Sequence, residues 1–225
     1  TGTFKDVKNR EKDNLLVLSK DGIRIGLLNY TYGTNGLPFS DPVYVNLVDS
    51  VLIKKDVTNA KNKDLDKLVV FVHWGYEYRD FPNSYQKKYN RFFQDLGVDI
   101  VIGSHPHVIQ PMEYSKKNNQ EFLTVFSLGN FVSNQRAERK DGGAMLRLSF
   151  KKTDNNLLIS RKEYIPVWVH KFIEKEKYHF QILPCARPIY NEKYFSNKED
   201  FQKMKTFLAN TRAHLNTNNL AIEEG

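Results

Sequence analysis

Two short apolar runs, separated by a single amphipathic segment, constrain the fold of this chain more than any other feature of its sequence. The runs cover residues 68–72 and 98–102, and valine, isoleucine, leucine and phenylalanine dominate both of them. Apolar runs of this length are typical of strands that are covered on both faces, as in parallel sheets. The segment between them is long enough for the helix that a parallel connection needs. The pattern therefore predicts a βαβ unit within an α/β fold.

The segment between the two runs carries signals for the start and the end of a helix. Asn83 is suited to cap the N-terminus, with Gln86 at the third helical position as its reciprocal partner. Gly97 stands where the helix is expected to end. Helical spacing places five apolar side chains on one face, which we expect to pack inward. They are Tyr85, Tyr89, Phe92, Phe93 and Leu96.

The remaining sequence indicates more strands and two more helices. Strands are predicted at 15–18, 23–30, 43–47, 122–126, 144–150, 158–169 and 178–183, with a tight turn at Asp21-Gly22 after the first. Helices are predicted at 49–62 and from a capping box at Ser196 to about residue 215, followed by a polar tail that we expect to fray. We expect a mixed central sheet, covered by helices and by a second, antiparallel sheet built from residues 122–169.

Composition and charge limit the class of protein. Apolar residues make up 40% of the 225 residues, as in a globular chain, and no apolar run is long enough for a transmembrane helix. The net charge of +8 favours polyanionic partners, although a lysine-rich soluble surface explains it equally well. The single cysteine, Cys185, excludes an intrachain disulfide. The first residue is Thr1, so we expect a processed chain or a piece of a longer one, with any signal or anchor upstream.

Histidines follow both apolar runs. His73 comes directly after the first run, and His105 and His107 come shortly after the second. The carboxyl ends of parallel strands meet at one edge of a sheet, where α/β proteins bind their ligands. Pro106 favours an extended His105, which would point both imidazoles of the pair the same way. We predict that the three rings form one cluster suited to zinc, manganese or iron, the alternative being three structural histidines.

Four motifs appear in the chain in a fixed order. They are Tyr30-Thr31-Tyr32-Gly33-Thr34-Asn35-Gly36, then His73-Trp74-Gly75-x-Glu77, then Gly103-Ser104-His105-Pro106-His107-Val108, and then Ser127-Leu128-Gly129-Asn130-Phe131. In this order and spacing they resemble the poly-gamma-glutamate capsule biosynthesis (CapA) family, which is similar in fold to calcineurin-like metallophosphoesterases. The resemblance covers about residues 1–150.

The resemblance implies an α/β, calcineurin-like metallophosphoesterase fold, a layered β-sandwich flanked by helices, with its N-terminal part missing here. It divides the chain into a CapA-like domain at 1–184 and a C-terminal helical extension at 185–225. The family's Gly-Asp pair and Asn-Asn-His segment are absent from this sequence. The carboxylate that bridges two metal ions would then lie upstream. We therefore expect this chain to bind metal weakly and to turn over little substrate.

The same resemblance suggests roles for individual residues. It implies a divalent metal (Mn, Zn, Fe or Mg) with His73, His105 and His107 as ligands, and His73 and Glu77 as catalytic groups. Tyr30, Thr31, Asn35 and Asn130 would contact the substrate or orient the ligands. Two alternatives stay open: Glu77 as an exposed loop residue, and Asn130 as a residue that tolerates a left-handed turn.

The implied function is hydrolysis or transfer at a phosphate or an amide during the synthesis of a cell-surface polymer. An acidic polymer such as poly-gamma-glutamate is the expected partner, together with other membrane proteins of capsule synthesis. The alternative is a non-catalytic component that binds polyanion during capsule synthesis or export. We expect a location at the cell surface or in the periplasm, with a membrane anchor outside this chain. Nucleic acid is not expected, because the sequence lacks a dense basic tract with interleaved aromatic residues.

Overall fold

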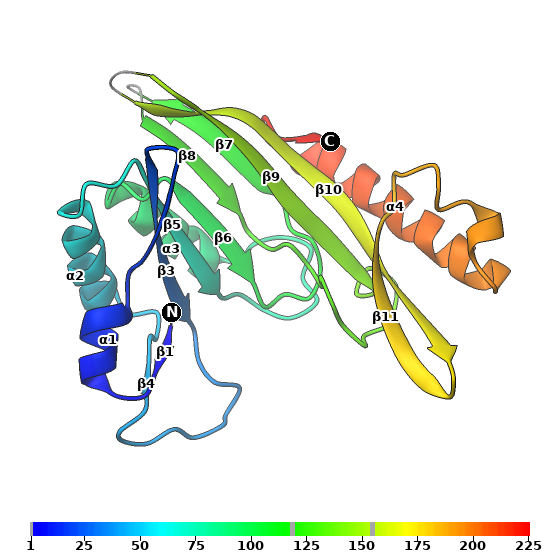
Figure 1. The fold of residues 1–225 in the computed structure, drawn as a ribbon, viewed down its shortest axis with the longest axis horizontal. Coiled ribbons are helices and arrows are strands. Elements are labelled where there is room, and N and C mark those ends of the chain that lie inside the picture. The colour runs from blue at the N-terminus through cyan, green and yellow to red at the C-terminus, as the bar shows by residue number, and fades with distance from the viewer. Residues whose placement is uncertain (1, 118–119, 154–155) are drawn as a thin grey trace.

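Two β-sheets packed face to face form the body of the protein in a computed structural model, which describes residues 2–117, 120–153 and 156–225. Helices flank the pair of sheets (Figure 1). In chain order the elements are β1 (Thr3–Phe4), α1 (Val7–Asp13), β2 (Leu16–Lys20), β3 (Ile23–Thr31), β4 (Tyr44–Val45), α2 (Ser50–Lys61), β5 (Lys67–His73), α3 (Ser84–Asp95), β6 (Ile100–Ser104), β7 (Met112–Lys117), β8 (Gln120–Val125), β9 (Gly142–Lys152), β10 (Leu157–Glu174), β11 (Lys177–Pro184), a 3-10 turn η1 (Glu192–Tyr194), α4 (Lys198–Asn218) and β12 (Glu223–Glu224).

The central sheet is mixed, as predicted, and has the strand order β2-β3-β5-β6-β8-β7. Strands β3, β5, β6 and β8 run parallel, and the two outer strands β2 and β7 run antiparallel to their neighbours. Side chains such as Val70 and Val101 on one face pack against α2 and α3, including Ile53 and Phe93. The predicted βαβ unit is β5-α3-β6, with its strands directly paired.

The second sheet begins later in the chain than predicted. Strands β9, β10 and β11 are antiparallel neighbours, and β12 joins β10 in parallel. The predicted strand at 122–126 does not belong to this sheet, because it forms part of β8 and pairs with β6 in the central sheet. The burial of β8 explains the correction: Glu121 to Val125 are all buried, as an interior strand requires.

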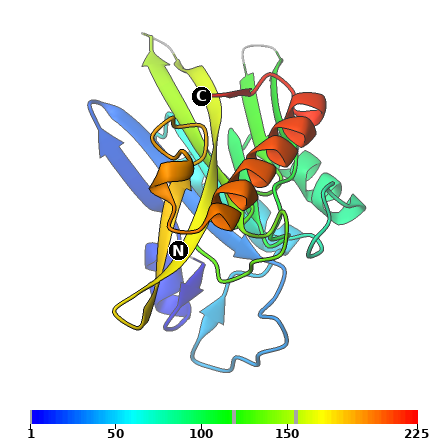
Figure 2. The same cartoon turned by 90° about the vertical axis from the view of Figure 1, so that its right-hand side faces the viewer.

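The main core lies between the two sheets and includes the C-terminal helix. Val69, Ile100 and Leu123 of the central sheet share it with Ile159 and Trp168 of the second sheet. Helix α4 lies along one side of the second sheet and contributes to this core (Figure 2). The domain boundary at residue 184 stays a prediction. No helix among the described residues is long and apolar enough to cross a membrane.

The chain after α4 is ordered, which corrects the expectation of a frayed tail. Ile222 is buried in the core, and β12 pairs with β10. Arg212 donates two hydrogen bonds to Glu224, each 2.7 Å long. The start of α4 also differs by one residue, because Asn197 rather than Ser196 caps it by accepting from the Glu199 backbone N–H.

Helix α3 has the predicted capping box and packs its five predicted apolar side chains on the core, but two polar side chains are buried there as well. Its fully buried side chains are Gln86, Asn90 and Phe93, whereas the predicted tyrosines are only half-buried. The two polar side chains tolerate burial because each is paired: Gln86 Nε2 donates to Gln110 Oε1 at 2.8 Å, and Asn90 Oδ1 accepts from Thr124 Oγ1 at 2.8 Å. Apolar periodicity alone cannot show such pairing.

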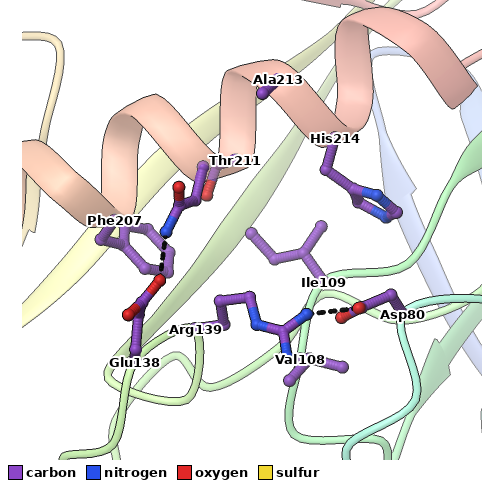
Figure 3. A pocket seen from close by; sticks show the side chains of 10 residues that line it. Asp80, Val108, Ile109, Glu138, Arg139, Phe207, Thr211, Ala213 and His214 are labelled. Carbon is purple, nitrogen blue, oxygen red and sulfur yellow. Dashed lines mark hydrogen bonds and ion pairs between the residues drawn. The ribbon is translucent and has the colours of Figure 1, made fainter.

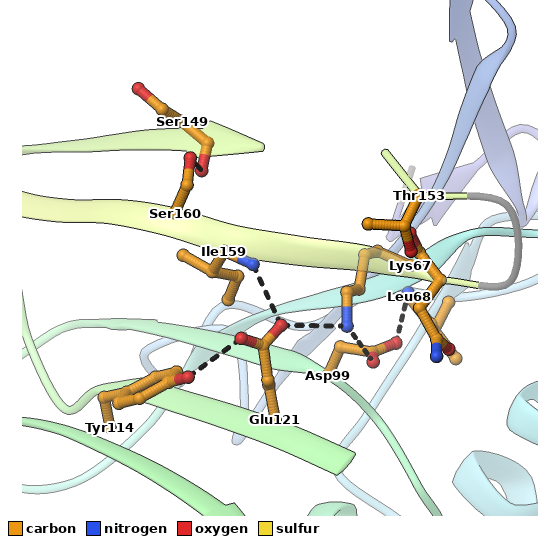
Figure 4. A network of polar contacts seen from close by, with 10 residues as sticks. Lys67, Leu68, Asp99, Tyr114, Glu121, Ser149, Thr153, Ile159 and Ser160 are labelled. Atoms are coloured by element: carbon orange, nitrogen blue, oxygen red, sulfur yellow. Dashed lines mark hydrogen bonds and ion pairs between the residues drawn. The ribbon is translucent and has the colours of Figure 1, made fainter. Parts of the chain in front are cut away.

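A buried polar network joins the two sheets at the start of the parallel strands (Figure 4). Lys67 Nζ lies 3.1 Å from Asp99 Oδ1 and 3.5 Å from Glu121 Oε2. Glu121 also accepts from the Tyr114 hydroxyl at 2.8 Å and from the Ile159 backbone N–H at 2.9 Å. Since Ile159 belongs to β10, this carboxylate fixes the second sheet against the first. The network lies at the end of β5 opposite His73.

Candidate functional site

The three predicted histidines meet at the carboxyl edge of the central sheet. His73 is the last residue of β5 and pairs in register with Ser104, the last residue of β6. His105 and His107 follow immediately. The ring centroids of His73 and His105 are 4.6 Å apart, and those of His105 and His107 are 6.2 Å apart. The predicted cluster is confirmed, whereas its role as a set of metal ligands stays a prediction.

The backbone that carries the pair of histidines is not extended, contrary to the expectation drawn from Pro106. His105 has a φ of 100° and His107 a φ of 59°, both in a region that residues with a side chain rarely adopt. The Pro106 carbonyl accepts from the Tyr78 backbone N–H at 2.7 Å, which anchors the turn to the loop after β5. Strain of this kind costs on the order of 1–3 kcal/mol for each residue and is typical of functional sites.

Asn130 orients His107. Its Oδ1 lies 2.8 Å from His107 Nδ1, and its Nδ2 donates to the Lys140 carbonyl at 2.7 Å. An amide oxygen beside Nδ1 requires the proton on that nitrogen, which leaves Nε2 as the free acceptor. The turn at this point is made by Gly129, with a φ of 72°, rather than by Asn130. Of the two roles considered for Asn130, the geometry favours orientation of the histidine.

The other two imidazoles are in a form suited to bind a cation. Burial, and then the neighbouring His105 and His107, lower the pKa of His73 to about 4. Burial also lowers the pKa of His105. His73 Nδ1 is 3.3 Å from Ser104 Oγ, whereas His105 Nδ1 is buried and has no hydrogen-bond partner in the described part of the chain. Neutral imidazole is the form that ligates metals.

The other predicted site residues are divided between the edge and the core. Glu77 Oε1 lies 3.8 Å from His107 Nε2 at the open side of the cluster. Thr31 Oγ1 donates to the Gly33 carbonyl and shapes the loop after β3. Asn35 accepts from the Tyr32 hydroxyl at 2.5 Å. Tyr30 is fully buried with its hydroxyl 2.9 Å from Asp56 Oδ2, so the structure places it outside the site.

Two tyrosines at the edge were not among the predicted site residues. The Tyr32 ring lies 4.6 Å from that of His105 and stacks on His73 at 5.8 Å with an interplanar angle of 9°. The Tyr78 ring stacks on His107 at 6.0 Å. Tyr32 lies within one of the four motifs, and its place directly after a strand end was the signal that could have identified it. Tyr78 follows Glu77 and has no comparable signal.

The donor types at this edge fit a divalent metal, but the arrangement is incomplete. Imidazole nitrogens suit zinc, manganese and iron, and His105 Nδ1, which no described residue hydrogen-bonds, is available as a ligand atom. Within residues 2–117, 120–153 and 156–225, however, no group of three histidine, cysteine, aspartate or glutamate side chains has the arrangement needed to hold a metal ion. The chemistry of the donors thus suits a metal, while the described residues do not by themselves complete a site for one.

A comparison with protein families shows to which family the chain belongs. Residues 1–135 match the family of the bacterial capsule synthesis protein PGA_cap, which is more than half of the chain and includes all four motifs. The chain belongs to the PGA_cap family. The resemblance inferred from the motifs is thereby confirmed.

Two curated relatives of this PGA_cap chain agree with the assignment. The capsule biosynthesis protein CapA of Bacillus anthracis is 28% identical over 188 residues, which are 80% of this chain and 44% of that protein. The PGA biosynthesis protein CapA of Bacillus subtilis (strain 168) is 36% identical over 115 residues, which are 51% of this chain and 28% of that protein. The chain thus spans less than half the length of the curated relatives it matches.

Solved structures show a more distant likeness to the PGA_cap chain. The NAD nucleotidase of Haemophilus influenzae gives a TM-score of 0.48 at 10% identity, over 99% of this chain and 41% of that one. The calcineurin-like phosphoesterase YfkN of Bacillus subtilis gives 0.38 at 12% identity, over 90% of this chain and 58% of that one. The α/β class and the pair of sheets flanked by helices are confirmed by the architecture itself.

The contact between Asn130 and His107 makes a testable prediction for the PGA_cap site. Asn130→Leu removes the acceptor for His107 Nδ1–H, so the ring loses its fixed tautomer and orientation. We expect zinc affinity, measured by calorimetry, to fall about 10- to 100-fold. Asn130→Asp, which retains an oxygen at that position, should keep most of the affinity. Asn134→Leu, in the same loop, is the control, and equal zinc binding by Asn130→Leu and the unaltered chain would contradict the assignment.

Proposed function

We propose that this chain provides the histidine edge of a metal-dependent hydrolase with a calcineurin-like site, acting in the synthesis of a poly-gamma-glutamate-type cell-surface polymer. The observation that carries the proposal is the convergence of His73, His105 and His107 at one sheet edge, with the third ring oriented by Asn130. Membership of a capsule synthesis family supports the choice of polymer. We propose a place of action at the cell surface or in the periplasm.

In this proposal the chemistry is divided among the residues at the edge. His73, His105 and His107 would hold the metal, with Glu77 beside His107. A bound divalent ion polarises the bond under attack and lowers the pKa of a coordinated water. Glu77 is placed to take up a proton, since its carboxylate is partly exposed and lies 3.8 Å from His107 Nε2. The Tyr32 and Tyr78 rings form the sides of the cluster and hold the imidazoles in place.

A second function has separate support. The incomplete ligand arrangement and the net charge of +8 favour a non-catalytic component that binds an acidic polymer during capsule synthesis or export. Its partners would be the polymer and other membrane proteins of capsule synthesis. Such binding depends on exposed lysines and arginines, so it should weaken as salt rises. It would not require the histidines.

The two functions are separated by metal binding and turnover. We expect the chain to bind one Zn²⁺ or Mn²⁺ ion weakly by calorimetry, because imidazole ligands carry no negative charge and Glu77 would be left to neutralise the cation. His105→Ala should lower that affinity at least tenfold, while His179→Ala, an exposed histidine in β11, should leave it unchanged. Hydrolysis of a phosphodiester and of poly-gamma-glutamate is then measured with each metal.

The outcomes of this experiment differ for the two proposals. Turnover that is lost in His105→Ala supports the hydrolase. Salt-dependent binding of poly-gamma-glutamate by both variants, without turnover while metal is bound, supports the binding component. Equal metal affinity of His105→Ala and the unaltered chain would overturn the histidine edge as a metal site.

A further inference from the structure

A pocket of about 370 Å³ lies beside the histidine edge, between α4 and the loops that follow β5 and β6 (Figure 3). The two loop residues Val108 and Ile109 directly follow His107, and Asp80 lies three residues after Glu77. The opposite wall comes from α4, which lies outside the family match of residues 1–135. The volume is within the range of small-ligand sites, roughly 300–1,000 Å³.

The floor of the pocket is apolar. Val108, Ile109 and Phe207 line it, and all three are otherwise buried. Ala213 lines the helical side with no more than a methyl group. A floor of this kind favours an aliphatic group over a charged one, because it offers no hydrogen bonds to replace those that a charged group makes with water. The pocket is therefore suited to a ligand with a short aliphatic part.

The rim is polar and does not carry net positive charge. Arg139 is paired with Asp80, and Glu138 accepts from Asn210 Nδ2 at 2.7 Å (Figure 3). Two carboxylates and one guanidinium thus line the rim. A ligand carboxylate entering here would meet like charges and would have to displace Asp80 from Arg139. The rim disfavours an anion and leaves carboxylate oxygens available to N–H donors of a ligand.

His214 supplies the complementary donor. Its ring projects from α4 toward the loop that carries Asp80 and packs edge-on against Phe81 at 5.3 Å (Figure 3). Nδ1 lies 3.5 Å from the Asn218 amide nitrogen, a donor, and this arrangement suits the tautomer that carries its proton on Nε2. Nε2 is buried and has no hydrogen-bond partner among the residues that the structure describes, and Asp80 lies near the ring. Burial lowers the pKa of this imidazole, in agreement with a neutral ring.

We propose that this pocket binds an uncharged amide on an aliphatic stem, as found in a short peptide or polyamide segment. The amide carbonyl accepts from His214 Nε2–H, the amide N–H donates to the Asp80 or Glu138 carboxylate, and the stem packs on the apolar floor. The site requires no metal and goes beyond the proposed hydrolase edge. A polyamide offers these groups in every repeat, so its backbone rather than its carboxylates is recognised here.

Two matched probes test the proposal on the metal-free chain. N-acetyl-L-leucine methylamide is neutral, and N-acetyl-L-leucine replaces its second amide by a carboxylate. We expect the neutral probe to bind the pocket and the acid to bind at least fivefold more weakly, as followed by amide NMR shifts of α4. An acid that binds as tightly as the amide would overturn the proposal.

Variants locate the binding and separate it from the histidine edge. His214→Phe keeps the contact with Phe81 but removes the Nε2–H donor, and it should weaken the neutral probe about two- to tenfold. Ala213→Trp fills the pocket from an exposed helical position and should abolish binding. His179→Phe is the matched control, and His105→Ala should also leave the affinity unchanged. Unchanged binding in Ala213→Trp would place the probe elsewhere and refute the site.

Discussion

Replacing Gly103 with alanine should destabilise the protein by about 3–5 kcal/mol. A methyl group at this position of β6 would overlap the Phe126 carbonyl oxygen and the indole nitrogen of Trp74. These two atoms are hydrogen-bonded to each other at 2.9 Å inside the core, so separating them leaves a buried donor and a buried acceptor unpaired. The strain comes one residue before Ser104, at the edge that carries the histidines.

Urea unfolding measures this loss, with Gly33→Ala as the matched control. No atom of the described residues lies within 4 Å of a Cβ added at Gly33, and its φ is not positive, so the same substitution is expected to change stability by less than about 1 kcal/mol. A Gly103→Ala variant as stable as Gly33→Ala would show that β6 and the Phe126 backbone can separate without cost.

Lys67→Met should also cost about 3–5 kcal/mol, because it leaves a buried charge cluster without its cation. Asp99 and Glu121 then face each other with only neutral hydrogen-bond donors (Figure 4). Lys152→Met is the matched control. Its Nζ lies 3.1 Å from Asp66, the same distance as Lys67 from Asp99, but its side chain is 46% exposed against 8% for Lys67. Exposed pairs contribute about 0–1 kcal/mol.

The loss of stability caused by Lys67→Met should become smaller as the pH falls. Burial already raises the pKa of Asp99, and the nearby Glu121 raises it further. Removing Lys67, which lowers it, leaves a carboxyl group whose folded pKa exceeds its unfolded value. Such a group stabilises the fold below the unfolded pKa, and this contribution is lost as the pH rises through the folded pKa. The deficit should therefore be smaller at pH 5 than at pH 7, and an equal deficit at both would contradict the account.

The sequence was sufficient to predict the parts of the fold that depend on local signals. The β5-α3-β6 unit, the capping box at Asn83 and the turn at Asp21-Gly22 follow from patterns within a few residues, and all three are present. The convergence of His73 with His105 also follows, since paired parallel strands end at the same edge.

The parts that the sequence did not reveal depend on distant partners. Gln86 faces inward because Gln110 receives its amide, and Tyr30 is sequestered because Asp56 binds its hydroxyl. Ile222 belongs to the core only because β12 pairs with β10. The positive φ of His105 likewise depends on a contact between the loop after β6 and the loop after β5. No pattern within a short window encodes these choices.

The shared core between the sheets also governs the order in which the chain becomes protected during synthesis. Strands β3, β5, β6 and β8 emerge from the ribosome before β9 and β10. Until then Val69, Ile100 and Leu123 have an inner face without a covering layer. The last links also join distant parts of the chain, since Leu220 bridges to Glu113 and β12 reaches back to β10. From this topology we expect slow folding and a period in which the nascent central sheet is prone to aggregation.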